Sequence, residues 1–196
     1  MAELVAGGKG VIEAILRRRS LAPRKLVAPG PDASQLELLI SAAAAAPDHG
    51  RLHPVRFVQI ADAGRATLAQ LFRQAASQME PQAGPELADR EAEKAHHAPC
   101  LLAVVARIDD ANPVAPAHEQ WISVGAAVQN VLLAAEDLGF RAMIVSGRKV
   151  QSRLLQAAFA PTGSEHLVGF VAIGTPTAEP SPRDRHPGSL AHWSGT

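Results

Sequence analysis

A basic turn near the N-terminus has the residue types that bind phosphate. Arg17, Arg18 and Arg19 are followed directly by Ser20, at the end of residues 9–19, whose apolar spacing predicts a short helix. Guanidinium groups form forked hydrogen bonds with phosphate oxygens, and a nearby hydroxyl adds a donor. The turn is therefore a candidate anion site. Basic residues at a helix C-terminus also interact favourably with the helix dipole, so a purely structural role stays open.

The loop from residue 47 to residue 54 is the second place where chemistry could concentrate. It holds one aspartate, two histidines and one arginine between two prolines. Loops held between rigid elements often carry ligand contacts. His49 and His53 would share one face only on a helix, and the prolines and Gly50 disfavour a helix there. The loop lacks a complete metal-ligand set, so we predict no metal site.

A strand that ends in Ser146 and Gly147 offers a third candidate site. Residues 140–145 read as this strand, and a serine–glycine turn at its end can present backbone N–H groups to a ligand. By contrast, His96 and His97 end a charged, exposed helix predicted over residues 86–97. Adjacent histidines at a helix C-terminus are compatible with its dipole, and we therefore predict a surface location for both.

A long helix over residues 118–139 is expected to hold these sites in place. Apolar residues recur in it at spacings of three and four, and Gly139 is a typical C-terminal cap. Further apolar side chains lie off that stripe, so the helix should be buried in a core or an interface. The stripe comprises Trp121, Val124, Val128, Val131, Leu132, Ala135 and Leu138.

The remaining elements complete a single α+β domain spanning residues 1–196. Helices are expected over residues 33–46, 64–79 and 150–158, and strands over residues 56–60, 100–106 and 167–174. This order predicts a three-layer αβα arrangement around a sheet of four or five strands. Residues 176–196 are polar and rich in proline, and they form an extended tail with too few apolar residues to fold alone.

Composition narrows the function classes. The 196 residues include 19 lysines and arginines against 19 aspartates and glutamates, and only 4% are aromatic. A neutral chain with few stacking residues gives no reason to expect a nucleic-acid or membrane partner. Cys100 is the only cysteine, so no intrachain disulfide can form. We expect a cytoplasmic protein without a signal peptide or membrane span. The sequence also lacks a P-loop, a Rossmann glycine pattern and a Gly-x-Ser-x-Gly nucleophile motif.

Five motifs in this order resemble the nitroreductase family of FMN-dependent oxidoreductases, and its short members in particular. They are Arg-Arg-Ser at 18–20, Ala-Pro-Asp-His at 46–49 with His-Pro-Val-Arg-Phe at 53–57, Leu-Gly-Phe at 138–140, Ser-Gly at 146–147, and Val-Gly-Phe-Val-Ala-Ile-Gly-Thr-Pro at 168–176. The resemblance spans residues 10–177. It implies a mostly antiparallel sheet flanked by helices, in an intertwined homodimer with FMN at the subunit interface.

The resemblance also implies which residues hold the cofactors. The basic turn would take the FMN phosphate and ribityl chain, and the strand end would pass along the flavin ring. His49 would reach the flavin from the partner subunit. The implied FMN-binding residues are Arg18, Arg19, Ser20, Ala45, His49, His53, Ile144, Val145, Ser146 and, late in the chain, Arg185, with Arg183 as its alternative. The nicotinamide cofactor would adjoin Ala134, Ala135, Glu136, Asp137, Leu138 and Gly139.

The implied activity is a two-step redox reaction. NAD(P)H would reduce FMN, and FMN would then reduce a nitroaromatic, a quinone or a similar small acceptor, so that no catalytic side chain is required beyond a proton relay by His49. Two departures leave alternatives open. Val55 stands where the family commonly has tryptophan, and Ile144-Val145 stands where short members carry Trp-Arg. The alternatives are an FMN-binding protein of the same fold with dehalogenase-like, oxidase-like or no turnover, and a structural domain without a ligand.

Overall fold

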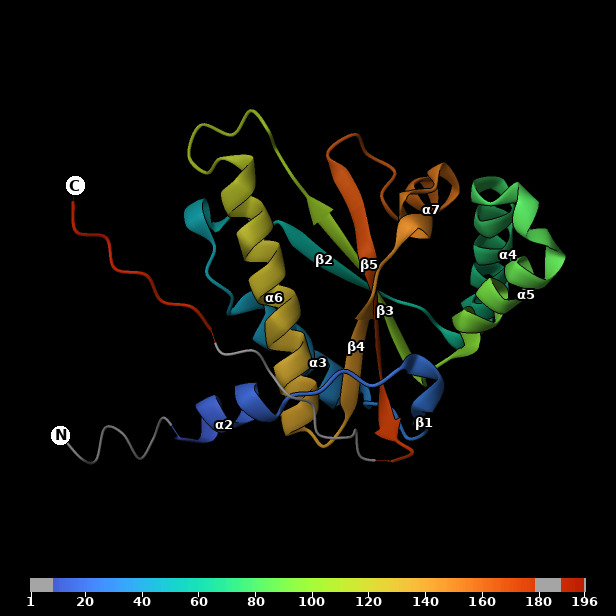
Figure 1. The fold of residues 1–196 in the computed structure, drawn as a ribbon, viewed down its shortest axis with the longest axis horizontal. Helices are drawn as coiled ribbons and strands as arrows, with labels where there is room; N and C mark the ends of the chain where they lie inside the picture. Colours follow the sequence, from blue (N-terminus) through green and yellow to red (C-terminus); the bar gives the residue numbers. More distant parts are fainter. Residues whose placement is uncertain (1–8, 179–187, 196) are drawn as a thin grey trace.

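A five-stranded sheet forms the centre of the molecule, with helices on both faces (Figure 1). The computed structural model describes residues 9–178 and 188–195. The strands are β1 (Leu26–Val27), β2 (Val55–Gln59), β3 (Cys100–Arg107), β4 (Arg141–Val145) and β5 (Glu165–Pro176). They follow the order β1-β5-β3-β2, with β4 also paired to β5, and every one of these pairings is antiparallel. The predicted α+β class with a mostly antiparallel sheet is confirmed.

Strand β5 is the centre of the sheet because it pairs with three other strands. Its register places Val171 opposite Leu102 of β3 and Ile144 of β4, and Thr175 opposite Val27 of β1. The side chains from Val171 to Ile173 are fully buried. A strand covered on both faces has no polar side to show, which explains its uninterrupted apolar sequence. The short strand β1 was not predicted, because two residues carry no periodicity.

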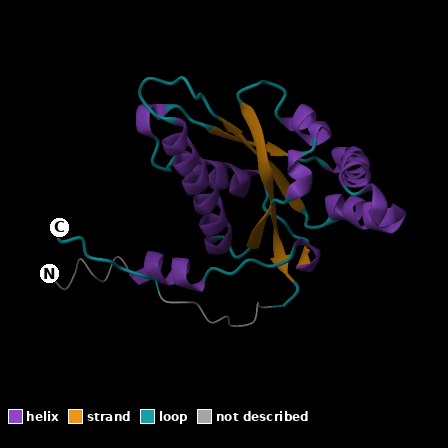
Figure 2. Ribbon diagram, turned by 45° about the horizontal axis from the view of Figure 1, so that its top comes forward, coloured by secondary structure: helices purple, strands orange, loops and turns teal. Residues whose placement is uncertain are grey.

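The helices form two layers, one on each face of the sheet (Figure 2). Phe72 and Phe170 belong to the core of the first layer, and Leu39 and Val131 to that of the second. The first layer contains α4 (Asp62–Met79), α5 (Gly84–Glu93) and α7 (Arg153–Phe159), and the second contains α3 (Ala33–Ala44) and α6 (Ala117–Asp137). Short 3-10 turns connect them: η1 (Pro23–Lys25), η2 (His49–Arg51), η3 (Pro81–Ala83), η4 (Lys94–His96) and η5 (Arg148–Gln151).

The long helix α6 is buried along most of the predicted stripe, but not at its first turns. Val124, Val131 and Ala135 are buried against the sheet and α3. Trp121 and Ile122, by contrast, are 41% and 66% exposed, so the predicted burial of Trp121 is wrong within one chain. A helix that is apolar over more than one face meets only one face of the sheet here, and the excess apolar surface stays open.

Helix α2 (Lys9–Arg17) projects from the body, on the same side as residues 188–195 (Figures 1 and 2). Its apolar face lies in solvent: Val11, Ile12, Ile15 and Leu16 are 43–63% exposed. An isolated helix of this length is marginal in water, since its nucleation is costly and its hydrogen bonds are few. Helix α2 therefore needs a covering surface that the described parts of this chain do not supply.

Candidate functional site

The basic turn after α2 leads directly into the wall of a cavity. The Arg18 guanidinium donates to Ser20 Oγ over 3.2 Å, which holds both side chains in one turn. The Arg19 guanidinium donates to the carbonyl oxygens of Leu16 and Arg18, each at 3.3 Å. Two residues after Ser20, the chain reaches Ala22, which lines the cavity. The predicted phosphate residues therefore precede, in the chain, a segment that lines a cavity, although they are not among its lining residues.

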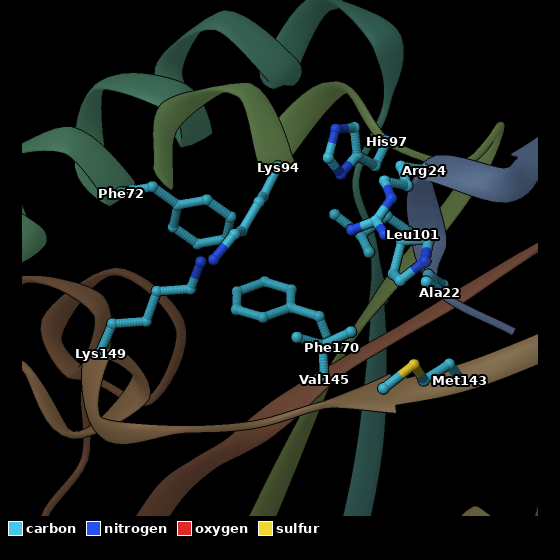
Figure 3. A pocket seen from close by; sticks show the side chains of 12 residues that line it. Ala22, Arg24, Phe72, Lys94, His97, Leu101, Met143, Val145, Lys149 and Phe170 are labelled. Atoms are coloured by element: carbon cyan, nitrogen blue, oxygen red, sulfur yellow. The ribbon is translucent and has the colours of Figure 1, made fainter. Parts of the chain in front are cut away.

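This cavity of about 180 Å³ opens at the edge of the sheet that carries β4 (Figure 3). Phe170 and Val145 contribute sheet surface, and Phe72 of α4 lies opposite them (Figure 3). The lining residues are Ala22, Pro23, Arg24, Phe72, Lys94, His97, Leu101, Met143, Val145, Lys149, Phe170 and Ala172.

The cavity combines apolar walls with basic groups and has no carboxylate among its described lining residues. Arg24, Lys94, His97 and Lys149 reach it from three different segments, with Lys94 and His97 both at η4 (Figure 3). Burial lowers the pKa of His97, opposed by Glu93 and assisted by Lys94, Arg24 and His96, so the neutral imidazole is favoured at pH 7. Such a set of donors suits a ligand that combines an aromatic body with acceptor oxygens and negative charge.

A buried arginine places His97 at this cavity. Arg65 of α4 is only 6% exposed, and its guanidinium donates to the carbonyl oxygens of Ala95, His97, Ala98 and Pro99 at 2.8–3.4 Å. Ala98 adopts a left-handed conformation with φ of 62°. The predicted surface location of His97 is therefore wrong, because Arg65 pins the carbonyls around it and turns the segment inward.

The end of β4 forms part of the cavity wall. The Val145 side chain lines the cavity, whereas Ile144 points to the opposite face of the sheet and packs beside α6. Ser146 Oγ donates to the Val168 carbonyl over 2.8 Å. A Cβ atom at Gly169 would lie 2.8 Å from the Val145 carbonyl oxygen, so only glycine allows this close approach of β5.

The histidine loop lies at the opposite edge of the sheet, because it leads into β2, and β3 and β5 separate β2 from β4. His49 Nδ1 lies 2.5 Å from Glu119 Oε2. The Asp48 carboxylate accepts a 2.7 Å hydrogen bond from the backbone N–H of His53. Ala45 is the exposed residue that ends α3. One chain therefore brings Ala22–Arg24, which follow the basic turn, and Val145 of β4 to one cavity, but not Ala45, His49 and His53.

The remaining predicted residues have varied positions. Ala135 and Glu136 are buried, whereas the other four residues of segment 134–139 are half-buried or exposed at the end of α6. Arg183 and Arg185 lie outside the described residues. Among residues 9–178 and 188–195, no cluster of three or more histidine, cysteine or carboxylate groups could hold a metal ion. Within the same ranges, no helix is both long and apolar enough to span a bilayer.

Several cavity residues escaped the sequence reasoning. They are Arg24, Phe72, Lys94, His97, Met143, Lys149 and Phe170. Only two had a usable local signal. Arg24 follows the basic turn by four residues, and Lys149 follows Ser146 by three. The others lie in helices or strands whose pattern indicates packing, and only the folded chain brings them together.

Comparisons with known proteins agree with this geometry. A protein of Haemophilus influenzae named "Putative NAD(P)H nitroreductase" is 37% identical over 152 residues, which cover 78% of this chain and 82% of that protein. The equally named YdjA of Escherichia coli is 32% identical over 174 residues, covering 87% and 90%.

Solved structures share the fold. A nitroreductase-like family protein from Bacillus cereus superposes with a TM-score of 0.76 at 21% identity, covering 90% of this chain and 91% of that one. Iodotyrosine deiodinase, solved with FMN and 3-iodo-L-tyrosine, gives a TM-score of 0.69 at 17% identity, covering 95% and 100%.

The sequence relatives and the family assignment support an oxidoreductase of the FMN type. The description of the nitroreductase family matches residues 15–175. That range holds the basic turn, the cavity and nearly the whole sheet. Because the match covers so much of the chain and two relatives exceed 30% identity over most of their own length, this chain belongs to the nitroreductase family.

Proposed function

We propose that this protein is an FMN-dependent oxidoreductase that takes electrons from NAD(P)H and passes them to a small acceptor such as a nitroaromatic or a quinone. One observation carries the proposal. The cavity beside β4 is lined by apolar side chains and by four basic ones, without a carboxylate among its described lining residues, and the basic turn ends two residues before its lining residue Ala22. The isoalloxazine ring is flat and rich in acceptors, and the phosphate of FMN is anionic, so this donor set fits the cofactor.

Each group of residues has a proposed task. Arg18, Arg19 and Ser20 hold the phosphate, since forked guanidinium donors and a hydroxyl match its oxygens. Arg24 and His97 donate to the ring oxygens and nitrogens, and Val145 provides an apolar wall. The backbone of Ile144, Val145 and Ser146 follows the edge of the ring. Arg185 adds a further phosphate contact, and Ala134–Gly139 adjoins the nicotinamide cofactor.

We also propose that the active form is a homodimer in which the partner copy completes the site. The apolar face of α2 and the side chains of Trp121 and Ile122 support this, because they are large apolar groups left 41–66% exposed in one chain. A second copy would cover them. It would also bring its own Ala45, His49 and His53 to the cavity from the opposite edge of its sheet. The chain could then assemble residues that a single copy keeps apart.

The chemistry divides between cofactor and protein. Bound FMN supplies hydride and electron transfer between the nicotinamide and the acceptor. The protein fixes the ring between the sheet and α4, neutralises the phosphate, and excludes water with the apolar lining. His49, presented by the partner copy, relays the proton that an acceptor such as a quinone takes up with its electrons. No side-chain nucleophile is needed for this reaction.

The first test is the visible absorption spectrum of the purified protein, recorded before and after anaerobic addition of NADPH. We expect flavin bands that bleach when NADPH is added. Flavin bands that persist would favour the alternative, a flavin-binding protein with a different reductant or no turnover. A protein that stays colourless after incubation with FMN would overturn the proposal, since a family member with these donors should retain the cofactor.

A further inference from the structure

A second cavity of about 280 Å³ continues from the first one. Both are lined by Lys94, Val145 and Lys149, so they share a boundary. The second cavity lies between the α4–α5 hairpin and the turn after β4. Its apolar surface comes from Ala76, Met79 and Leu87, and its polar surface from Ser146, Gly147 and five charged side chains. Val145 and Ser146, which are predicted to lie along the flavin, line this space, but the predicted cofactor roles do not account for its charged side chains.

Two lysines share one carboxylate at the boundary. Glu91 Oε2 accepts a 2.7 Å hydrogen bond from Lys149 Nζ, and Glu91 Oε1 accepts another from Lys94 Nζ. The side chains of Lys149 and Glu91 are only 15% and 17% exposed. Lys149 Nζ also lies 3.9 Å above the ring of Phe72 (Figure 3). Two ammonium groups and one carboxylate leave one positive charge in excess, shared between the poorly exposed Lys149 and Lys94, whose side chain is 45% exposed.

The remaining charges of the cavity do not cancel this excess. Arg148 Nη1 lies 3.6 Å from Glu80 Oε1, and both side chains are largely exposed, so this pair is weak and neutral in sum. Three cations and two carboxylates therefore line the cavity, with a net charge of +1. Burial lowers the pKa of Lys149 and the hydrogen bond to Glu91 opposes that shift. An uncompensated charge of this kind is costly unless an anion approaches it.

We propose that this second cavity is the subsite for an anionic group on the electron acceptor, and that the preferred acceptor is a small aromatic compound carrying a carboxylate. This proposal rests on the proposed function. The aromatic body would lie along Met79, Leu87 and Val145, next to the candidate flavin cavity. Its carboxylate would receive hydrogen bonds from the ammonium groups of Lys94 and Lys149, which Glu91 holds in place. Charge-assisted bonds of this kind are the strong ones in a desolvated site.

The test compares two acceptors of nearly equal shape, 4-nitrobenzoate and 4-nitrobenzamide, with the FMN-loaded enzyme. The quantity of interest is the ratio of their KM values, because effects on the flavin or on folding cancel in it. We expect Lys149→Met to raise the ratio of nitrobenzoate to nitrobenzamide about 10-fold, the usual cost of one charge-assisted hydrogen bond. Lys149→Arg should keep the ratio near that of the wild type.

The direction in which a second variant changes the KM ratio distinguishes a role of the lysines in acceptor binding from a purely structural role. Glu91→Gln raises the net charge of the cavity, so the KM ratio should fall below that of the wild type. A purely structural ion pair predicts no such reversal. Arg73→Met is the matched control, because Arg73 pairs with Asp89 across the same helix hairpin on its exposed side. An unchanged ratio in Lys149→Met, or a rise in Glu91→Gln, would overturn the proposal. A Lys149→Met variant that raises the KM for NADPH and leaves the KM for the acceptor unchanged would also overturn the proposal.

A calorimetric experiment keeps this inference separate from the cofactor assignment. Benzoate and benzamide are titrated into the wild type and into Lys149→Met, each with and without added FMN. We expect benzoate to bind more tightly than benzamide to the wild type, and we expect no such preference in Lys149→Met. If FMN fails to bind but the benzoate preference persists, the proposed function fails and the anion subsite stands. If FMN binds and the wild type shows no benzoate preference, the subsite is overturned while the flavin assignment stands.

Discussion

The Nδ1 atom of His49 lies 2.5 Å from the Oε2 atom of Glu119, which joins the histidine loop to the first turn of α6. Three residues of this loop have left-handed backbone conformations, with φ of 80° at Gly50, 53° at Arg51 and 48° at His53. Such conformations persist only where surrounding contacts hold them, and they concentrate at functional sites. The contact with Glu119 and the bond from His53 to Asp48 are two of those contacts.

This contact determines which ring nitrogen of His49 carries the proton. An ionised carboxylate only accepts, so the neutral imidazole must hold its proton on Nδ1 and leave Nε2 as an acceptor. We expect Glu119→Ala to shift the tautomer toward Nε2–H, as measured by nitrogen-15 NMR of the protein without flavin at alkaline pH. Glu119→Gln should keep the Nδ1–H form, since its amide oxygen still accepts. An identical tautomer in the alanine variant would contradict this assignment.

Removal of one arginine from the basic turn should weaken FMN binding but not riboflavin binding. Arg18→Ala and Arg19→Ala each remove donors proposed for the phosphate, and one charged hydrogen bond contributes about 1.5–3 kcal/mol, or at least a tenfold change in affinity. Quenching of flavin fluorescence measures both dissociation constants. Arg17→Ala is the neighbouring control, because Arg17 instead lies 3.6 Å from Glu136. Equal losses for FMN and riboflavin would indicate a structural role of the turn.

A charge on the exposed face of α6 should separate the proposed dimer. Ile122 is 66% exposed in one chain, and Ile122→Glu would bury a carboxylate in the interface between copies. We expect light scattering to report the mass of two chains for the wild type and of one chain for the variant, with weaker FMN binding in the latter. Gln74→Glu adds the same charge on the exposed side of α4 and should stay dimeric. A wild type with the mass of one chain would contradict the dimer.

The buried thiol of Cys100 should make stability fall at alkaline pH. Burial raises its pKa from 9.0 to about 11, despite the opposing charge of Arg65. The folded-state pKa is the higher one, so this stabilising contribution is full below pH 9.0 and is lost as pH rises through about 11. We expect urea unfolding to show that the wild type loses about 2 kcal/mol more than Cys100→Ala between pH 8 and pH 11. If the free energy of unfolding changes with pH in the same way in both proteins, the thiol ionises as easily in the folded state as in the unfolded state.

The sequence by itself determined the elements whose signal is local. The uninterrupted apolar run of residues 100–106 predicts a strand covered on both faces, and β3 is buried from Cys100 to Ala106. Asp32 directly precedes the helix predicted from residue 33, where an aspartate is a typical N-cap, and its side chain accepts the N–H of Gln35. The order of five short motifs was enough to indicate the family. Periodicity, caps and motifs depend on residues that are close in sequence, so they can be recognised without the tertiary structure.

Only the tertiary structure decided the make-up of the cavities and the exposed faces. Lys94 and Lys149 meet at Glu91 from segments 55 residues apart in sequence, and nothing local in either segment predicts the contact. His97 turns inward because a buried arginine 32 residues earlier binds its carbonyl. Trp121 continues the apolar stripe of α6 but stays 41% exposed, since only one side of its ring meets His166 of β5. Apolar pattern specifies that a face must be buried, whereas the surface that buries it, and the charges that meet there, depend on contacts between distant parts of the chain.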